Sequence, residues 1–84
     1  MHEIFLERAA ERDIKKLSTK DFRSVISHIK LLARTPRPSG CRKIADSKSD
    51  WRIRVGDYRI LYEINDRIKA VKVMRVRHRR EAYR

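Results

Sequence analysis

The sequence has little of what cross-links or breaks a polypeptide chain. Its 84 residues contain one cysteine, two glycines and two prolines. A lone cysteine, Cys41, cannot form an internal disulfide, which excludes a disulfide-stapled secreted scaffold, and we expect an inert thiol there. The scarcity of glycine and proline predicts dense secondary structure with short loops. The sequence also contains no apolar run long enough to span a membrane.

Acidic residues are scarce relative to basic ones. The chain has 23 lysines and arginines against 11 aspartates and glutamates, a net charge of +12. Such an excess favours nucleic acid, an acidic protein or an anionic membrane as partner, and the strand-like spacing of the arginines argues against the membrane. The first residues lack the cationic and apolar blocks of a signal peptide, so we expect a cytoplasmic protein. A hydrophobic fraction of 40% is enough for one small folded domain over residues 1–84.

Residues 51–62 carry the clearest structural pattern. Apolar and polar residues alternate on both sides of Gly56-Asp57, and glycine at the first central position predicts a two-residue type II′ hairpin turn. The register that follows pairs Val55 with Tyr58, Arg54 with Arg59, Ile53 with Ile60, Arg52 with Leu61, and Trp51 with Tyr62. Arg52, Arg54 and Arg59 then share the polar face of the hairpin.

This polar face is a candidate anion site. Like charges directly opposite on a sheet repel, so folding alone gives no reason to place Arg54 against Arg59. A phosphate would relieve the repulsion, because guanidinium groups bind phosphate through two parallel hydrogen bonds. The alternative is an ordinary solvated face that happens to be basic. On either interpretation the face is outward, so we expect replacement of Arg59 to affect folding little.

The remaining periodicities predict an α+β domain. A short strand at residues 4–6 is followed by a helix over 7–17, a second helix that begins at a Ser18–Asp21 cap, a polar loop over 41–50, the hairpin, and a last strand over about 68–76. The expected buried residues outside the hairpin are Leu6, Ala10, Ile14, Leu17, Phe22, Val25, Ile26, Ile29, Ala33 and Ile44. The predicted fold is an antiparallel-rich sheet of about four strands, in the order β-α-α-β-β-β, with a helical hairpin packed on one face.

Two features of the C-terminal third stay open. A two-residue turn at Asn65-Asp66 would place Val71 and Val73 on the core face, whereas a three-residue loop would place Ala70 and Met74 there. Residues 75–84 gather five more arginines with His78 and Tyr83. They are either a frayed basic tail or a second RNA contact, in which Tyr83 could stack on a base and His78 could carry a proton.

The hairpin of residues 51–64, taken together with residues 76–84, resembles the RelE toxins of the RelE/ParE superfamily, and the likeness extends over the whole chain. The resemblance implies the toxin of a type II toxin–antitoxin pair, which enters the ribosomal A site, cuts messenger RNA and is inhibited by a small acidic RelB-like antitoxin in a hetero-oligomer. The catalytic residues that it implies are Arg52, Arg54, Arg59, Arg79 and Tyr83. We expect further RNA contacts from Lys43, Arg75, Arg77, His78 and Arg80.

The implied reaction needs neither metal nor cofactor. The 2′-hydroxyl of RNA attacks the adjacent phosphate to give a 2′,3′-cyclic phosphate, and fixed guanidinium groups stabilise the charge that develops on the phosphoryl oxygens. Tyr83 is the candidate base, because neighbouring cations favour its phenolate. Arg79 is the candidate acid, with His78 in reserve. Two other classes stay open, a ParE-like gyrase inhibitor on the same fold and a non-catalytic RNA-binding module.

Overall fold

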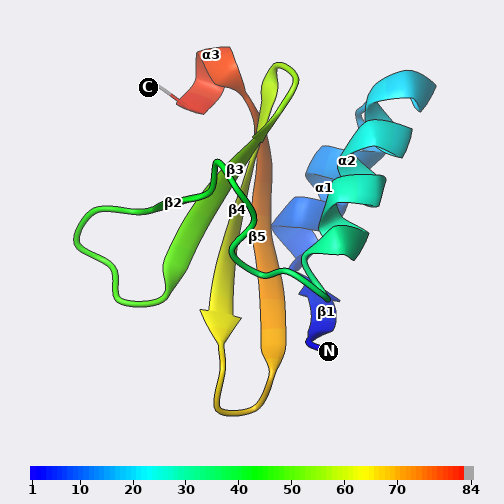
Figure 1. The fold of residues 1–84 in the computed structure, drawn as a ribbon. Coiled ribbons are helices and arrows are strands. Elements are labelled where there is room, and N and C mark those ends of the chain that lie inside the picture. Colours follow the sequence, from blue (N-terminus) through cyan, green and yellow to red (C-terminus); the bar gives the residue numbers. More distant parts are fainter. Residues whose placement is uncertain (83–84) are drawn as a thin grey trace.

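The computed structural model describes residues 1–82, which form a five-stranded sheet with two helices packed on one face (Figure 1). In chain order the elements are β1 (Glu3–Leu6), α1 (Arg8–Lys15), α2 (Thr19–Leu31), β2 (Arg42–Lys43), β3 (Asp50–Val55), β4 (Tyr58–Asn65), β5 (Ala70–His78) and α3 (Arg79–Ala82). The strand order is β1-β5-β4-β3-β2, with β1 parallel to β5 and the other neighbours antiparallel. The predicted α+β class is confirmed. The fifth strand is the two-residue β2, which forms inside the expected loop.

The predicted β3–β4 hairpin is confirmed in every pair. Val55 lies opposite Tyr58, Arg54 opposite Arg59, Ile53 opposite Ile60, Arg52 opposite Leu61 and Trp51 opposite Tyr62. Gly56 has a φ of 59°, the left-handed value that the first central residue of a type II′ turn requires and that glycine adopts without strain.

The β4–β5 connection differs from both predicted turns. Asn65 pairs with Ala70, so the loop has four residues, 66–69, and the side-chain oxygen of Asn65 accepts the N–H groups of Arg67 and Ile68. A four-residue loop keeps the parity of a two-residue turn, because both lengths are even. Val71 therefore lies on the core face. The strand also runs two residues further than expected, to His78.

A β-bulge in β5 changes which residues face outward. Tyr62 pairs with Val73 but its neighbour Leu61 pairs with Arg75, so Met74 is an extra residue in β5. An extra residue inverts the inside–outside alternation of the strand beyond it. Val76 consequently faces the core, and Arg77 faces the opposite side of the sheet.

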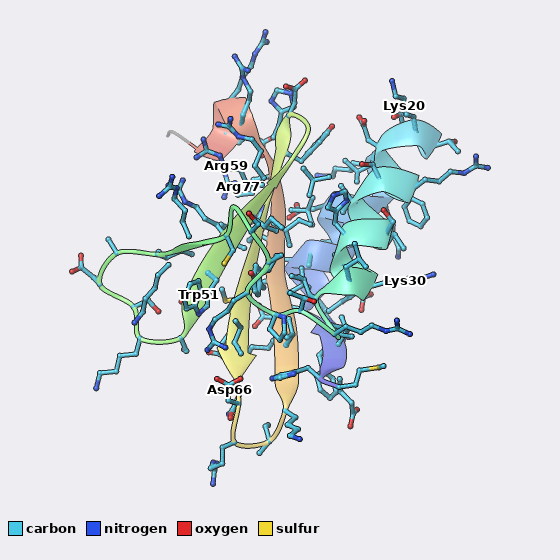
Figure 2. All side chains as sticks on the ribbon, viewed as in Figure 1. Lys20, Lys30, Trp51, Arg59, Asp66 and Arg77 are labelled. Atoms are coloured by element: carbon cyan, nitrogen blue, oxygen red, sulfur yellow. The ribbon has the colours of Figure 1, made fainter. Side chains whose placement is uncertain are left out.

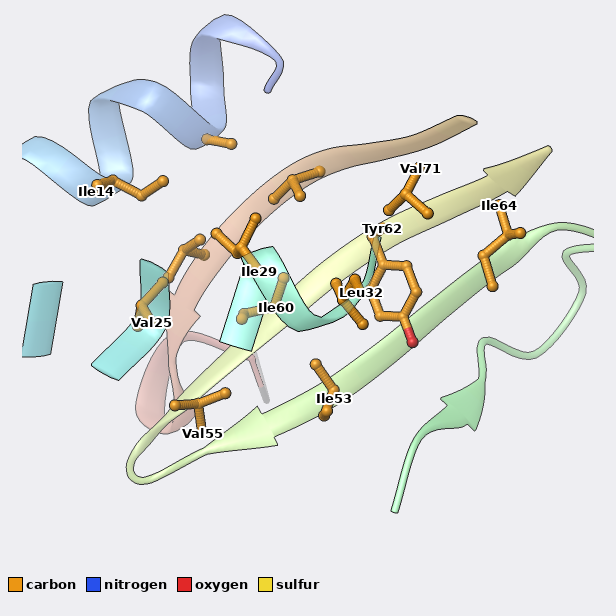
Figure 3. Close-up of a cluster of buried hydrophobic side chains, with 13 residues drawn as sticks. Ile14, Val25, Ile29, Leu32, Ile53, Val55, Ile60, Tyr62, Ile64 and Val71 are labelled. Atoms are coloured by element: carbon orange, nitrogen blue, oxygen red, sulfur yellow. The ribbon is translucent and has the colours of Figure 1, made fainter. Parts of the chain in front are cut away.

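The core fills the space between the helices and the sheet (Figure 3). Its buried members are Ala10, Ile14, Val25, Ile29, Leu32, Ile53, Val55, Ile60, Tyr62, Ile64, Val71, Val73 and Val76. The expected cap of α2 is present, since Ser18 Oγ accepts the N–H of Asp21 at 3.2 Å.

Some burial predictions for the helices and loop were wrong. Leu32, not Ala33, completes the buried stripe of α2, because it lies three residues after Ile29 and is fully enclosed. Phe22 is 43% exposed and lies outside the core cluster. Leu6 is exposed, and Ile44 is only half-buried. Within residues 1–82, no helix is long and apolar enough to cross a membrane.

Asp13 of α1 binds the edge of β5 beyond the point where β1 ends. Its carboxylate accepts hydrogen bonds from Arg75 Nε at 2.9 Å, Arg75 Nη2 at 3.2 Å and the Val76 N–H at 2.9 Å. Burial raises the pKa of this carboxyl, but the hydrogen bonds from Arg75 and Val76 outweigh it, so the pKa of Asp13 lies below its ordinary value. Asp13 thus takes the place of a neighbouring strand at this edge.

Candidate functional site

Three arginines lie side by side across the face of the sheet that the helices leave uncovered. Arg54 of β3 pairs with Arg59 of β4, and Arg59 pairs in turn with Arg77 of β5. Residues directly opposite on antiparallel strands point to the same face, so these side chains form a row, hereafter the arginine row. Figure 2 shows Arg59 and Arg77 next to each other beneath α3. Arg77 joins the row because of the bulge at Met74.

Arg59, at the centre of the arginine row, is only 7% exposed. The expectation that its replacement would be an ordinary surface substitution was therefore wrong. Arg59 lies on a central strand, between Arg54 and Arg77. Arg59 also interacts with other groups of the protein, so it is held in place rather than free. A guanidinium that is shielded from water and fixed in position acts more strongly on an anion than a solvated one does.

Two cavities meet at the arginine row. The first, the sheet cavity, has a volume of about 470 Å³ and lies over the uncovered face, where Lys43, Arg77 and Glu81 contribute to its lining. The second, the α2 cavity, has a volume of about 590 Å³ and lies between β3, residues 38–40 and His28 of α2. Arg52 and Arg59 line both cavities. The two hollows are therefore parts of one basic groove.

The charge in this groove is almost entirely positive. In the sheet cavity the acidic lining residue is Glu81, whose Oε2 lies 3.9 Å from Arg77 Nη2, too far for a strong ion pair. Arg77 Nε is buried and has no hydrogen-bond partner among the residues that the structure describes. Buried donors are normally satisfied, so an unsatisfied guanidinium nitrogen on the strand next to Arg59 favours a bound anion.

Among the expected site residues that follow Arg77, those that the structure describes lie apart from the arginine row. Arg79 and Arg80 line a third cavity of about 480 Å³ with Asp57 and His78, at the hairpin turn. Arg79 Nη1 is 3.9 Å from Asp57 Oδ1, and its side chain is 64% exposed. His78 lies on the helix-covered face, where its ring meets that of Tyr58 edge-on with centroids 5.3 Å apart. Its Nδ1 accepts the N–H of Arg80 at 3.2 Å, which fixes the start of α3.

Other predicted residues have mixed positions. Lys43 lines the sheet cavity and is close to the arginine row. Arg75 is bound to Asp13 at the edge of the sheet. The hydrogen bonds and the charge of Asp13 raise the pKa of the Arg75 guanidinium above its ordinary value, and they outweigh the opposite effect of burial. Tyr83 lies outside the described residues. Over residues 1–82, the His, Cys, Asp and Glu side chains form no group of three that could hold a metal ion.

Sequence reasoning missed two residues of the α2 cavity. Arg42 lies opposite Arg52 because β2 pairs with β3, but a two-residue strand has too few positions to show a period of two. His28 lies on the polar side of α2, where a cavity-lining residue is indistinguishable in sequence from a solvated one. The one available signal was the basic pair Arg42-Lys43, a few residues before the arginine-rich hairpin.

Solved toxin structures have the same fold. The toxin in the RelBE2 toxin–antitoxin complex of Mycobacterium tuberculosis is 26% identical, with a TM-score of 0.82 over 92% of this chain and 96% of that one. The archaeal RelE–RelB complex of Pyrococcus horikoshii gives 20% identity and a TM-score of 0.83, covering 93% and 94% of the two chains. The isolated RelE toxin of E. coli is 18% identical, with a TM-score of 0.81 over 99% of this chain and 96% of that one. At 20% identity and below, these likenesses establish the fold.

Family membership follows from the sequence comparison. A search of curated proteins found no match. The sequence model for the ParE toxin of the type II toxin–antitoxin system parDE matches residues 4–83, which is nearly the whole chain. Together with the five-stranded sheet and its two covering helices, this match shows that the chain belongs to the ParE toxin family of the RelE/ParE superfamily and is a type II toxin–antitoxin toxin.

Proposed function

We propose that this toxin is an endoribonuclease that cuts messenger RNA at the ribosomal A site. The observation that supports the proposal is the arginine row. Three guanidinium groups on adjacent strands, the central one shielded from water, form a fixed cluster of donors for the oxygens of one phosphate. A toxin that acts only by binding a protein has no need to align Arg54, Arg59 and Arg77 in this way.

The reaction is a transesterification within the RNA. The 2′-oxygen attacks the adjacent phosphorus, the bond from phosphorus to the 5′-oxygen breaks, and the products are a 2′,3′-cyclic phosphate and a 5′-hydroxyl. Negative charge builds up on the non-bridging oxygens, where Arg59 donates from the centre and Arg54 and Arg77 donate from either side. Arg52, which lines both cavities, holds the phosphate as the chain enters.

Two proton transfers complete the reaction. In the proposal, Tyr83 removes the proton of the 2′-hydroxyl, and Arg79 protonates the leaving 5′-oxygen, which is basic enough to accept a proton from a guanidinium. The exposure of the Arg79 side chain supports its part, because it is free to turn from Asp57 toward the groove. His78 is engaged by Tyr58 and by the Arg80 N–H, which makes it a less suitable reserve acid than the sequence indicated.

The net charge of +12 supports simultaneous binding to mRNA and to ribosomal RNA, because both are polyanions. In the proposal the toxin acts where the ribosomes are, in the cytoplasm. We assign Lys43, Arg77 and Arg80 to contacts with the RNA backbone. Arg75 contributes positive charge to the same end of the sheet, but its guanidinium is occupied by Asp13.

The proposed partner is a small acidic antitoxin. The similar toxins of Mycobacterium tuberculosis and Pyrococcus horikoshii were solved as RelBE complexes, which supports a RelB-like antitoxin and a hetero-oligomer for this chain. An acidic segment over the groove would neutralise the like charges of the arginine row. The toxin should therefore be isolated readily with its antitoxin and should stop growth when expressed without it.

The test combines growth with transcript mapping. Induction of the wild-type chain should arrest growth, and primer extension should reveal new 5′ ends within reading frames. Cleavage of RNA by the purified toxin should also persist in EDTA, provided that the ribosomes are first cross-linked so that loss of Mg²⁺ does not dissociate them. Arg59→Ala should abolish both effects, because one such donor is worth about 2.7–4 kcal/mol in the transition state. Arg67→Ala, an equal charge change in the β4–β5 loop, is the matched control and should remain toxic.

A second candidate is a ParE-like gyrase inhibitor, favoured by the family model that matches. It predicts growth arrest with intact transcripts and inhibition of DNA supercoiling by the purified toxin. The third candidate, a non-catalytic RNA-binding module, predicts RNA binding without new 5′ ends. Full toxicity of Arg59→Ala with transcripts still cut would show that the arginine row is not the catalytic site.

A further inference from the structure

We propose that the α2 cavity binds the nucleotide next to the scissile phosphate, an inference that rests on the proposed ribonuclease function. The cavity is bounded by β3, by residues 38–40 and by His28 of α2. Its volume of about 590 Å³ lies within the range of sites that hold small organic ligands, roughly 300–1,000 Å³, so a nucleotide fits. The catalytic assignment uses Arg52, Arg54 and Arg59 of its lining and gives no role to Arg42, His28 or residues 38–40.

The strand pairing opens a route into this cavity. β2 contacts β3 only at Trp51 and Arg52, so residues 53–55 have no strand neighbour on that side within the described part of the chain. An RNA chain whose phosphate lies on the arginine row can therefore cross the edge of β3 at Arg54. The next sugar and base then enter the space beneath α2.

The lining suits a phosphodiester chain. Arg42, Arg52, Arg54 and Arg59 contribute to it, and the described lining residues include no carboxylate. Arg42 lies opposite Arg52 across the β2–β3 pair, which places a further guanidinium beyond the arginine row. A second phosphate, one nucleotide along the chain, is the ligand that this additional cation fits.

His28 gives the cavity a polar group of defined character. Its Nδ1 lies 2.8 Å from the carbonyl oxygen of Ser24, and since a carbonyl only accepts, Nδ1 carries a hydrogen. In the neutral ring, Nε2 is then a hydrogen-bond acceptor. An acceptor in a cavity that Ser39 also lines suits a base amino group.

The wall opposite β3 is fixed in advance of binding. The Tyr62 hydroxyl donates to the Pro36 carbonyl at 2.8 Å, and burial raises the pKa of Tyr62, so the hydroxyl keeps its proton. Arg37 Nη2 lies 2.9 Å from Asp66 Oδ2, and its guanidinium carbon lies 5.1 Å from the centre of the Trp51 ring. These contacts hold residues 36–38 against the sheet, so little ordering is required when a nucleotide binds.

The experiment measures binding of fully 2′-O-methylated RNA, which lacks the attacking hydroxyl and cannot be cut. Fluorescence anisotropy with the purified toxin gives the Kd of a labelled tetranucleotide and, by competition, of a dinucleotide that contains a single phosphate. Both are measured over a range of KCl concentrations. The variants are Arg42→Ala, Arg42→Gln and His28→Ala, with Arg67→Ala as the equal-charge control on the β4–β5 loop, at the far end of the sheet from α3 (Figure 1).

Both Arg42 variants should weaken tetranucleotide binding about tenfold and reduce the slope of log K against log salt by roughly 0.7, the value for one phosphate contact on a single strand. His28→Ala should weaken it about threefold with the slope unchanged, as loss of a neutral hydrogen bond does. Dinucleotide binding should be the same for the wild type and the Arg42 variants, because the second phosphate is missing, whereas His28→Ala should weaken it about threefold as well. Arg67→Ala should leave the tetranucleotide slope unchanged.

If Arg42 and His28 variants match Arg67→Ala, the nucleotide does not enter the α2 cavity and the inference is overturned. It is also overturned if they lose affinity for the antitoxin but not for RNA, since the cavity then serves that partner. Failure of the proposed function itself is distinct, because the wild-type toxin would then produce no new 5′ ends, whatever the Arg42 and His28 variants do to tetranucleotide binding. Thermal melting of each variant shows whether the fold is kept, and agreement between Arg42→Ala and Arg42→Gln excludes a packing effect.

Discussion

The contact between Asp13 and β5 gives the sharpest stability prediction. The Asp13→Asn substitution keeps the size of the side chain but removes the charge that accepts three hydrogen bonds from Arg75 and the Val76 N–H. It also turns an amide N–H₂ toward those donors. The Asp13 side chain is only 13% exposed, whereas that of Arg75 is 39% exposed. Water therefore screens the ion pair with Arg75 more than the backbone hydrogen bond.

The expected cost follows from these contacts. Hydrogen bonds to charged groups contribute about 1.5–3 kcal/mol, and a partly exposed ion pair adds at most about 1 kcal/mol. We expect Asp13→Asn to lower the free energy of unfolding by about 2 kcal/mol, because the amide oxygen still accepts one hydrogen bond. For a domain of this size the Tm falls by roughly 8–16 °C. Urea unfolding followed by circular dichroism, with thermal melts in parallel, measures both quantities.

The pH dependence tests the cause. The pKa of Asp13 is lowered in the folded state, so between that value and the unfolded pKa of about 3.9 the unfolded chain binds more protons. The stabilisation is complete above the unfolded pKa and is lost as pH falls through the folded one. The gap between wild type and Asp13→Asn should therefore close below about pH 4. A gap that is independent of pH, or an equal loss in the exposed control Glu11→Gln, would refute the argument.

Three further predictions follow from local geometry and charge. Gly56→Ala should destabilise the protein by about 1–2 kcal/mol in urea unfolding, because an added Cβ meets no neighbour but φ remains left-handed, and an unchanged midpoint would contradict the type II′ turn. Ser18→Ala should cost about 1 kcal/mol through loss of the bond to the Asp21 N–H, with Ser18→Asp retaining stability in the same assay. RNA binding should weaken at least about tenfold over a few-fold rise in salt, and an affinity flat across that range would exclude the basic groove as the contact surface.

The β3–β4 hairpin could be predicted in full because all its information is local. A strict period of two and a glycine at the turn determine both the register and the face of every residue. The helices were predictable for the same reason, since their apolar stripes and the Ser18 cap lie within a few residues of sequence. The alignment of Arg54 with Arg59 follows from these local rules alone.

The rest of the candidate site depends on contacts that the local pattern does not contain. Arg77 faces Arg59 only because Met74 bulges out of β5, and the change of parity between Val73 and Val76 does not say which residue is the extra one. Arg75 is bound by Asp13, a residue from the other end of the chain. Arg59 is likewise buried in the folded sheet, although the alternation of the hairpin marks it as an outward residue. In each case tertiary packing decides a position that the charge pattern left open.

The parallel pairing of β1 with β5 has a consequence for the synthesis of the toxin. Glu3–Leu6 of β1 pair with Ala70–Val73 of β5. The first strand to be synthesised therefore pairs only after the last of the five strands has been made. A pairing between distant parts of the chain forms late and slowly, because the intervening loop must be ordered first. The arginine row, which needs β5 in register, is assembled at the same late stage. A chain that stops before β5 therefore carries the basic hairpin without the complete site, so an active toxin forms only after β5 has been synthesised.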